Sequence, residues 1–545
     1  MKRPSRQRYR RLFLIALAIP VICLLVFFSA RSWLLEKALQ KVQRKLDERT
    51  GLKLDWRSDG FTGWRTVWIT GVSLAPPAGD TLLTIDSVSV VPSIWGALTG
   101  TPGISAIHVL KCTLQLVEQD GRSNYSALLK SGKDSTVTTQ PSARGTSDYA
   151  TLLHRLIDQA FALAPQQARL DTIRFIWKRD TAFASLLVPE FRSDRDNLAG
   201  MLVDVRTNDR WTLRGSFSQR KEVFDLTIAP AQQQKRLPLS ILGWNLTAGF
   251  DTLHLALYES DFSKRTLKLK GHVSTEGFFL HHARISDDTI RVEHARFDGL
   301  ASVRGSAFEL DSSSSAELNR IVVRLTAAFD KSENWKASLR LKTLPLEGSD
   351  FFRSLPEGIF ETVRDIKADG TLSFHLDIGV DRAVPDSVRF DCGLDRDRFR
   401  IRSYGSSGLG RMNGEFIHAV YEYDRFIRSF PVGPSNPAFT PLDQISPYFR
   451  NAVLTSEDGS FFYHSGFNED AFRKSIATNL KQGRFARGGS TISMQLIKNV
   501  FLTRKKTVAR KAEEALIVWL IERNRITSKD RMFEVYLNII ELGPN

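Results

Sequence analysis

The pattern of hydrophobic and polar residues divides the chain into parts with different periodicities. Residues 12–30 contain no charged side chain, and as a helix they would span roughly 28 Å, close to the hydrocarbon thickness of a bilayer. Over residues 31–50 the apolar positions recur at helical spacing. We therefore expect a transmembrane anchor followed by an amphipathic stalk helix at the membrane surface.

Charges beside the uncharged segment predict its orientation. Residues 1–11 contain basic side chains and no acidic one, which favours a cytoplasmic N-terminal tail. We expect a single-pass protein of the cell (inner) membrane whose bulk lies outside the cytoplasm. A cleaved signal peptide is the alternative, and the basic residues that follow residue 30 weaken the charge asymmetry.

Residues 51–403 alternate between apolar and polar side chains with the period of two that is typical of β-strands. This predicts a β-rich region of antiparallel strands. Residues 126–148 are rich in Ser, Thr, Lys and Gly, which predicts a flexible excursion, and residues 149–163 have helical spacing. Prolines mark residues 404–440 as a linker, and helical periodicity predicts a separate domain at residues 441–545.

The N-terminal order of elements resembles the AsmA-like family of envelope proteins. The resemblance rests on the anchor, the short helix and the strand sequences GVSL at 71–74 and TLLTIDSVSV at 81–90. In that family such a sheet curls into an apolar groove. The resemblance therefore implies lipid handling, or a spacer that positions the following domain, and a plain scaffold is the alternative.

Composition narrows the class of partner. The 545 residues carry a net charge of +16, which suits nucleic acid, a phospholipid surface or a phosphorylated substrate. No zinc-finger or RNA-binding signature accompanies the charge, so we expect no nucleic acid. The spacing of Cys23, Cys112 and Cys392 predicts no metal site and no disulfide framework. A bridge between Cys112 and Cys392 stays open, although two free thiols are favoured. Length and pattern together predict an α+β multidomain chain.

Four local patterns in residues 441–545 hold the candidate chemistry. In the first, Glu457 and Asp458 precede an aromatic cluster and His464. Aromatic neighbours desolvate a carboxyl group, which raises its pKa towards the range of a general base. Taken alone, such a carboxylate pair is more often a solvated helix end.

The second pattern is a glycine pair, Gly488 and Gly489, before a new helix. Ser490 can cap that helix, whose free N–H groups suit an anion. Helical spacing places four polar residues on one face, namely Thr491, Gln495, Lys498 and Asn499.

In the third pattern Glu514 lies one helical turn from Arg510 and Lys511, and Lys506 precedes them. These cations would hold Glu514 ionised. An ordinary surface salt-bridge helix is the alternative. The fourth pattern, at residues 529–538, has apolar spacing that indicates a structural helix.

In this order and spacing the four patterns resemble the glycosyltransferase domain of the peptidoglycan polymerases, a lysozyme-like, α-helical family that includes monofunctional transglycosylases and bifunctional penicillin-binding proteins. The resemblance implies that Glu457 is the general base and that Glu514 is the second carboxylate, near the pyrophosphate. It implies substrate contacts from the remaining polar positions: Asp458, His464, Ser490, Thr491, Gln495, Lys498, Asn499, Lys506, Arg510 and Lys511.

We therefore expect a membrane-anchored enzyme that polymerises lipid-linked disaccharide-peptide (lipid II) with inversion and releases polyprenyl pyrophosphate. By the resemblance, a divalent cation (Mg²⁺ or Mn²⁺) can bridge the pyrophosphate, although the sequence shows no dedicated metal ligands and we expect no organic cofactor. Membrane lipids and other cell-wall synthesis proteins are the further expected partners. Members of the family continue into further helices, so we expect the domain to be incomplete at residue 545, without a transpeptidase domain.

Two alternatives remain open. Two carboxylates around a sugar bond also describe a glycan-cleaving hydrolase, although the cations beside Glu514 favour a pyrophosphate substrate. The other alternative is an AsmA-like lipid-handling or scaffold protein with an inactive transglycosylase domain.

Overall fold

The structure is a computed structural model that describes most of the chain. It covers residues 28–540 apart from 49, 78, 94–102, 120–121, 127–147, 164–166, 181, 195, 232–245, 332–333, 423–424 and 503–506. Two compact units divide these residues: unit 1 comprises 1–143, 157–234 and 238–243, and unit 2 comprises 144–156, 235–237 and 244–545. The expected basic tail, most of the expected anchor and the excursion therefore lie outside the described residues.

The predicted fold class needs a correction at its N-terminal transmembrane helix. Among the described residues, no helix is long and apolar enough to cross a membrane. The helix over residues 28–48 includes Glu36, Lys37, Lys41, Arg44 and Lys45, and these charges give it an amphipathic surface instead. Residues 12–27 of the expected span lie outside the described part.

Unit 1 is a sheet of mainly antiparallel strands, as the period-two pattern predicts. Among the described strands, the pair β5–β7 is instead parallel, over twelve opposed residues. A parallel pair needs a long crossover connection, and the intervening chain includes α4 (Tyr149–Leu163), a helix that the sequence predicts. The strands are β1 Lys53–Asp55, β2 Ser58–Thr62, β3 Thr66–Ala75, β4 Leu83–Pro92, β5 Ile104–Gln119, β6 Arg122–Ser123, β7 Gln167–Arg179, β8 Ala182–Asp194, β9 Asn197–Asp204, β10 Arg210–Ser218 and β11 Val223–Pro230.

Unit 2 contains a second run of antiparallel strands, followed by helices. Its longest ladder joins β14 to β15. Cys392 in this unit and Cys112 in unit 1 are free thiols. The strands are β12 Thr247–Gly249, β13 Thr252–Ser263, β14 Thr266–His282, β15 Ser286–Arg304, β16 Ala307–Leu310, β17 Ser315–Leu318, β18 Ile321–Asp330, β19 Lys336–Thr343, β20 Leu346–Glu347, β21 Lys367–Asp381 and β22 Arg389–Ser403, with helix α5 at Gly348–Arg353.

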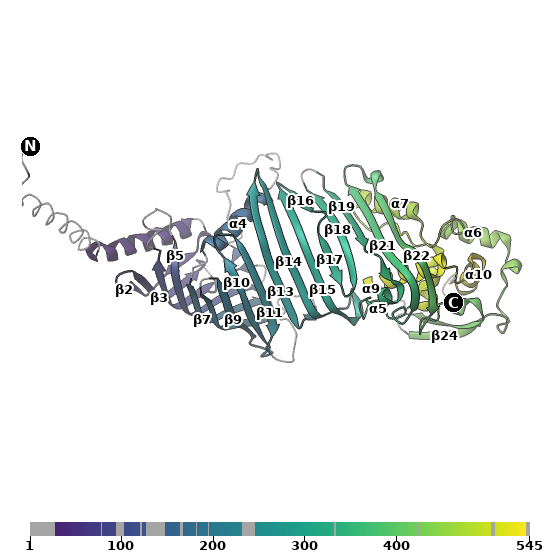
Figure 1. Cartoon of the computed structure of the whole chain (residues 1–545), viewed down its shortest axis with the longest axis horizontal. Helices are drawn as coiled ribbons and strands as arrows, with labels where there is room; N and C mark the ends of the chain where they lie inside the picture. Colours follow the sequence, from purple (N-terminus) through teal and green to yellow (C-terminus); the bar gives the residue numbers. More distant parts are fainter. Residues whose placement is uncertain are drawn as a thin grey trace, which may run out of the picture. The chain divides into compact units, whose positions relative to one another are not determined.

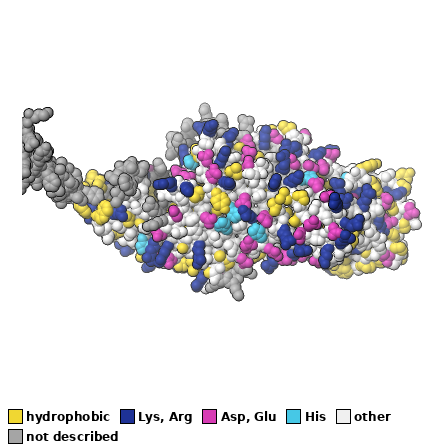
Figure 2. Space-filling view, in the orientation of Figure 1, with side chains coloured by type: hydrophobic (Ala, Val, Ile, Leu, Met, Phe, Trp, Pro, Cys, Tyr) yellow, Lys and Arg dark blue, Asp and Glu magenta, His cyan; other side chains and the backbone are white. Residues whose placement is uncertain are grey.

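The register in unit 2 separates an apolar face from a polar face. Leu267, Val303, Phe308 and Phe329 lie directly opposite one another on β14, β15, β16 and β18, and alternation puts them on one face. Leu267 is fully buried, whereas Phe308 and Phe329 are 40% and 42% exposed. Figure 2 shows acidic and basic side chains interspersed over the visible face of the strands.

Helices form the C-terminal part of unit 2, as predicted for residues 441–545. They are α6 Pro447–Glu457, α7 Glu469–Gln482, α8 Ile492–Phe501, α9 Val508–Arg523 and α10 Lys529–Ile539. Before them, β23 (Phe416–Glu422) and β24 (Arg425–Val432) pair as a hairpin inside the segment expected to be a linker. In Figure 1, α7, α9 and α10 group beside β21 and β22.

The helices and the end of the sheet share one hydrophobic core. Phe352 and Leu372 belong to the same buried cluster as Ile492, Ile517 and Phe533. Burial of these apolar side chains is the main source of stability for the helices and for this end of the sheet. The sheet of unit 2 is therefore the support on which the helices are packed.

Aromatic and ionic contacts fix α7 to the strands beside it. Phe390 of β22 stacks on Phe472 of α7 with ring centroids 5.2 Å apart. Lys481 Nζ lies 2.6 Å from a carboxylate oxygen of Asp386, and Arg473 donates to the carbonyl oxygen of Phe390. These contacts set the position of the loop that follows α7.

Candidate active site

Glu457 is the last residue of α6. The helix starts at Pro447, and Asp458 leaves the helical conformation with φ −161°, so the chain turns immediately after Glu457. Gln495 Nε2 of α8 donates a hydrogen bond to Glu457 Oε2 at 2.8 Å. This bond joins the first predicted pattern to the second.

The aromatic cluster does not bury Glu457, contrary to the expectation from the sequence. Glu457 is exposed. Phe461 is fully buried in the core, whereas Phe462 and Tyr463 are 43% and 91% exposed. The segment is a turn that buries the first ring and exposes the next two, so the rings form no apolar cover over the carboxylate.

Asp458 is the buried member of the carboxylate pair. His464 Nε2 donates to its Oδ2 at 2.9 Å, and the Ile492 N–H donates to the same oxygen at 3.2 Å. The Gly466 N–H donates to His464 Nδ1, which holds the imidazole ring in this orientation. Burial acts to raise the pKa of Asp458, but the His464 hydrogen bond and charge and the Ile492 N–H outweigh it and hold that pKa below its usual range. Asp458 thus ties the turn to the start of α8.

Thr491 caps α8, one residue later than expected. Its hydroxyl accepts from the Met494 N–H and donates to the Gly466 carbonyl oxygen at 2.7 Å. The prediction of Ser490 as the cap is therefore wrong, because the helix begins only at Ile492. Ser490 stays exposed and is available for other contacts.

A cation cluster surrounds Glu514 on α9. Arg510 Nη1 and Lys511 Nζ each lie 2.6 Å from a different oxygen of this carboxylate, and Glu514 is only 1% exposed. Lys511 also donates to Ser490 Oγ at 3.3 Å. The expected ion pairs are therefore formed, and Lys511 joins the third pattern to the glycine-rich segment.

Tyr536 of α10 completes the connections, and sequence reasoning did not single it out. Its hydroxyl donates to Gln495 Oε1 at 3.1 Å. Burial, with the charges of Glu457 and Asp458, raises the pKa of Tyr536 to about 12, so it stays a donor. A buried tyrosine hydroxyl usually needs a hydrogen-bond partner. The presence of Tyr536 among the apolar positions of the fourth pattern was therefore a signal for such a bond.

The structure gives less detail on three other predicted site residues. Lys498 and Asn499 follow Gln495 along α8 and are half-buried. Lys506 lies outside the described residues. Among the residues that the structure describes, no group of three or more potential metal-binding side chains is found, and Glu514 is already neutralised by two cations. The protein side of this site therefore does not suit a dedicated divalent cation.

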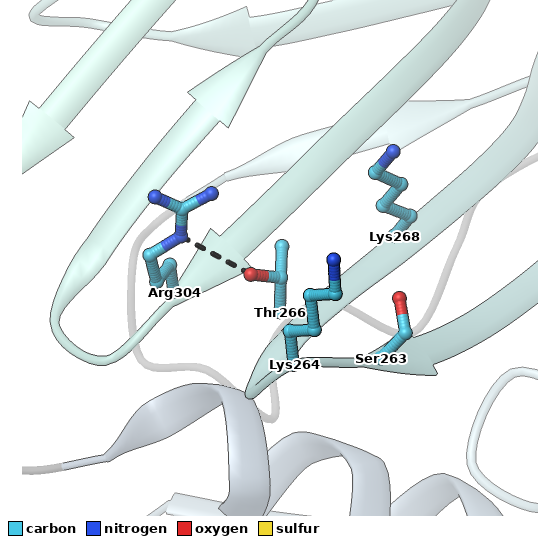
Figure 3. Close-up of a pocket in the computed structure, with 5 residues that line it drawn as sticks. All are labelled: Ser263, Lys264, Thr266, Lys268 and Arg304. Atoms are coloured by element: carbon cyan, nitrogen blue, oxygen red, sulfur yellow. Dashed lines mark hydrogen bonds between the residues drawn. The ribbon is translucent and has the colours of Figure 1, made fainter.

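A separate hollow of about 540 Å³ lies at the ends of β13–β15. Figure 3 shows its lining residues, with Arg304 donating to Thr266 Oγ1 at 3.1 Å. They are Ser263, Lys264, Thr266, Lys268 and Arg304. None of these residues belongs to the candidate site.

Comparison with known proteins identifies a family for this part of the chain. Residues 424–545 match the Transglycosylase family. The C-terminal part of the chain is a transglycosylase domain. All four hydrogen-bonded patterns lie within the matched residues.

Curated relatives of the transglycosylase domain have the printed name biosynthetic peptidoglycan transglycosylase. The protein from Nitrosospira multiformis is 48% identical over 103 residues, which are 19% of this chain and 44% of the relative. The protein from Methylobacillus flagellatus is 50% identical over 100 residues (18% and 43%), and one from Acinetobacter baumannii is 42% identical over 115 residues (21% and 50%). The chain thus spans half or less of the length of these relatives.

Proposed function

We propose that the transglycosylase domain is a peptidoglycan glycosyltransferase that polymerises lipid-linked disaccharide-peptide. Glu457 takes the proton from the 4-hydroxyl of the acceptor sugar. That oxygen attacks C1 of the lipid-linked donor, the new C1–O bond forms with inversion, and the bond from C1 to the pyrophosphate oxygen breaks. Polyprenyl pyrophosphate leaves with the electron pair, so the step needs no oxidant or reductant.

The observation that carries this proposal is a pair of hydrogen bonds, one from α8 to the base and one from a cation to the segment just before α8. Glu457 is held by Gln495 of α8, and the segment just before α8 contacts Lys511 through Ser490. A base held by α8 and a cation that contacts the residue after the glycine pair suit an acceptor hydroxyl and a departing anion. Family membership of this domain supports the same assignment.

We propose that Arg510 and Lys511 stabilise the negative charge that develops on the leaving group. Lys511 is 44% exposed and Arg510 is 14% exposed, so Lys511 is the cation better placed to reach a ligand. Glu514 holds both cations in position. A divalent cation at this site would be held by the phosphate oxygens of the substrate, and no step above depends on it. The proposal places the domain on the outer face of the cell membrane, where it would meet lipid-linked precursor and other cell-wall synthesis proteins.

The test is glycan-strand synthesis by the full-length protein with Glu457→Gln. Removing a general base costs roughly 10²- to 10⁴-fold in rate. Glu469→Gln is the matched control, because Glu469 is an exposed carboxylate of the same domain that pairs with Arg473 and such pairs contribute little. Polymerisation by Glu457→Gln at the parental rate would overturn the proposal.

Product analysis separates transfer from glycan cleavage. Longer strands with released lipid pyrophosphate support transfer, whereas shorter strands from preformed glycan support a hydrolase. The buried Glu514 with its two cations favours transfer, because cleavage of an uncharged sugar link needs no anion site.

A second function, lipid handling by the AsmA-like region, has one observation in its favour. Phe308 and Phe329 are directly opposed on β16 and β18, and each leaves about two-fifths of its surface exposed on the apolar face. Exposed apolar surface of this kind is typical of a binding site. The test compares phospholipid co-purifying with the parent and with Phe308→Ser/Phe329→Ser, and equal amounts would count against it.

A further inference from the structure

Three side chains from three helices form one hydrogen-bonded path that ends on the proposed base. Tyr536 Oη on α10 donates to Gln495 Oε1 at 3.1 Å, and Gln495 Nε2 on α8 donates to Glu457 Oε2 at 2.8 Å. Tyr536 is 1% exposed. Among the described residues, Gln495 is the hydrogen-bonded link between Tyr536 and Glu457.

The direction of this path is determined by chemistry. An amide side chain can present either its oxygen or its NH₂ group, and the hydrogen-bond network decides which. A tyrosine hydroxyl that stays protonated donates to the amide oxygen, so the NH₂ group must be turned towards Glu457. The opposite orientation would set the amide oxygen against a carboxylate and leave the Tyr536 hydroxyl facing an NH₂ group.

We propose that Tyr536 is a positioning residue that orients Gln495, and that Gln495 holds Glu457 as the base rather than binding substrate. The inference rests on the proposed function. The amide N–H occupies one carboxylate oxygen, Oε2, which leaves the other oxygen to take the proton of the acceptor hydroxyl.

The experiment measures kcat and KM of glycan-strand synthesis by the full-length protein. In Tyr536→Phe only the hydroxyl is lost, so kcat should fall about three- to tenfold, the effect of one hydrogen bond, while KM is unchanged. Gln495→Met should lower kcat further, again with KM unchanged.

A double variant distinguishes positioning from a merely structural role. If Tyr536 acts through Gln495, Tyr536→Phe adds nothing to Gln495→Met, because coupled residues are non-additive. Tyr448→Phe is the control, since Tyr448 lies on α6 and is 88% exposed; it should match the parent. Unfolding temperatures of all variants show whether the fold is kept.

The outcomes separate this inference from the proposed function. If Glu457→Gln abolishes synthesis while Tyr536→Phe keeps the parental kcat, the positioning role is overturned and the proposed function stands. Additive losses in the double variant also overturn the positioning role. If Glu457→Gln polymerises normally, both the proposed function and the positioning role are overturned.

Discussion

Glu513 and Glu514 are consecutive on α9 and both are buried, but Glu514 pairs with cationic side chains whereas Glu513 accepts a backbone N–H. Glu514 pairs with Arg510 and Lys511 of its own helix. Glu513 Oε1 accepts the backbone N–H of Thr362, from the loop before β21, at 2.6 Å. One carboxylate therefore belongs to the candidate site and the other fastens α9 to the β-rich part of unit 2.

We predict that Glu513→Gln stabilises the protein at neutral pH. Burial raises the pKa of Glu513 above its usual value of 4.5, partly opposed by the Thr362 hydrogen bond. A carboxyl group with a raised folded-state pKa destabilises the fold once it ionises, and this cost disappears when pH falls below its unfolded value. The amide of Gln can still accept the Thr362 N–H and has no charge to desolvate.

The measurement is the unfolding midpoint of parent and Glu513→Gln between pH 3 and pH 8. The gain should be present at pH 7 and should vanish near and below pH 4.5, where the parental carboxyl is neutral. A gain that is equal at both ends of the range would contradict an ionisation effect. Glu513→Ala, which removes the acceptor, should be less stable than Glu513→Gln at every pH.

Arg510 and Lys511 should differ in what they stabilise. Arg510→Met leaves the buried Glu514 with one partner and should cost about 3 kcal/mol of unfolding free energy. Lys511 is 44% exposed, so Lys511→Met should cost under about 1 kcal/mol. Both should slow strand synthesis, roughly 100-fold for the loss of one charge-stabilising group.

Denaturant unfolding and steady-state kinetics on the same preparations check this separation. The informative variant is Lys511→Met, which should be nearly as stable as the parent but slow. A fully active Lys511→Met would mean that this cation only neutralises Glu514 and does not reach the leaving group.

Asp458→Asn tests the buried link between the first pattern and α8. The variant weakens the bonds from His464 and the Ile492 N–H and should cost about 1–3 kcal/mol at neutral pH. Because the pKa of Asp458 is held below its usual value of 3.8, the parent keeps this stability above pH 3.8 and loses it as pH falls through the lowered pKa.

Acid unfolding followed by circular dichroism should therefore show the two curves converging below about pH 3.8. A constant gap down to pH 2 would mean that the Asp458 charge does not contribute. Asp443→Asn in the exposed lead-in to α6 is a control that should leave both stability and its pH dependence unchanged.

Local periodicity was enough to predict most elements of the fold. The alternation in residues 51–403 predicted strands, and helical spacing predicted α4 and the C-terminal helices. The spacing of charged residues also predicted the pairing of Glu514 with Arg510 and Lys511, because residues three and four apart on a helix are neighbours. These features depend on short stretches of chain.

Contacts between distant residues were not predictable in the same way. The bond from Gln495 to Glu457 joins residues 38 positions apart, and that from Tyr536 to Gln495 spans 41 positions. The sequence suggested that aromatic neighbours bury Glu457, but the turn after α6 directs Phe461 inwards and Tyr463 outwards. The parallel pair β5–β7 was missed because periodicity is the same in parallel and antiparallel strands.

Gly466 is a position where we predict that a single methyl group disrupts the site. Its φ is +91°, and a Cβ atom there would lie 2.5 Å from Val518 Cγ1. Gly466→Ala should therefore cost about 2–4 kcal/mol from backbone strain and overpacking. It should also displace the carbonyl oxygen that accepts from Thr491 and slow strand synthesis.

Gly483→Ala is the matched control at the end of α7. Gly483 has φ +63° but no atom within 4 Å of an added Cβ, so only the left-handed conformation is penalised, at about 1 kcal/mol. Thermal unfolding should order the proteins as parent, Gly483→Ala, Gly466→Ala. Equal losses in the two variants would show that contact with Val518 relaxes at little cost.

Phe390 allows a test of whether the sheet supports the glycine pair of the candidate site. Phe390 stacks on Phe472, and an added Cβ at Gly489 would lie 3.2 Å from the Phe472 ring, so one ring separates the sheet from the glycine-rich segment. Phe390→Ala should cost roughly 1–3 kcal/mol and loosen α7. Because Gly489 adjoins Ser490, we expect KM for the lipid-linked substrate to rise as well.

Hydrogen exchange of the α7 amides, with kinetics on the same variant, provides the measurement. Faster exchange in α7 together with a raised KM would show that β22 positions the site, since a mere loss of global stability would increase exchange throughout unit 2. Phe426→Ala in the hairpin is the control, because Phe426 is 53% exposed and should change neither quantity. A Phe390→Ala variant with parental KM would mean that α7 keeps the glycine pair in place without the sheet.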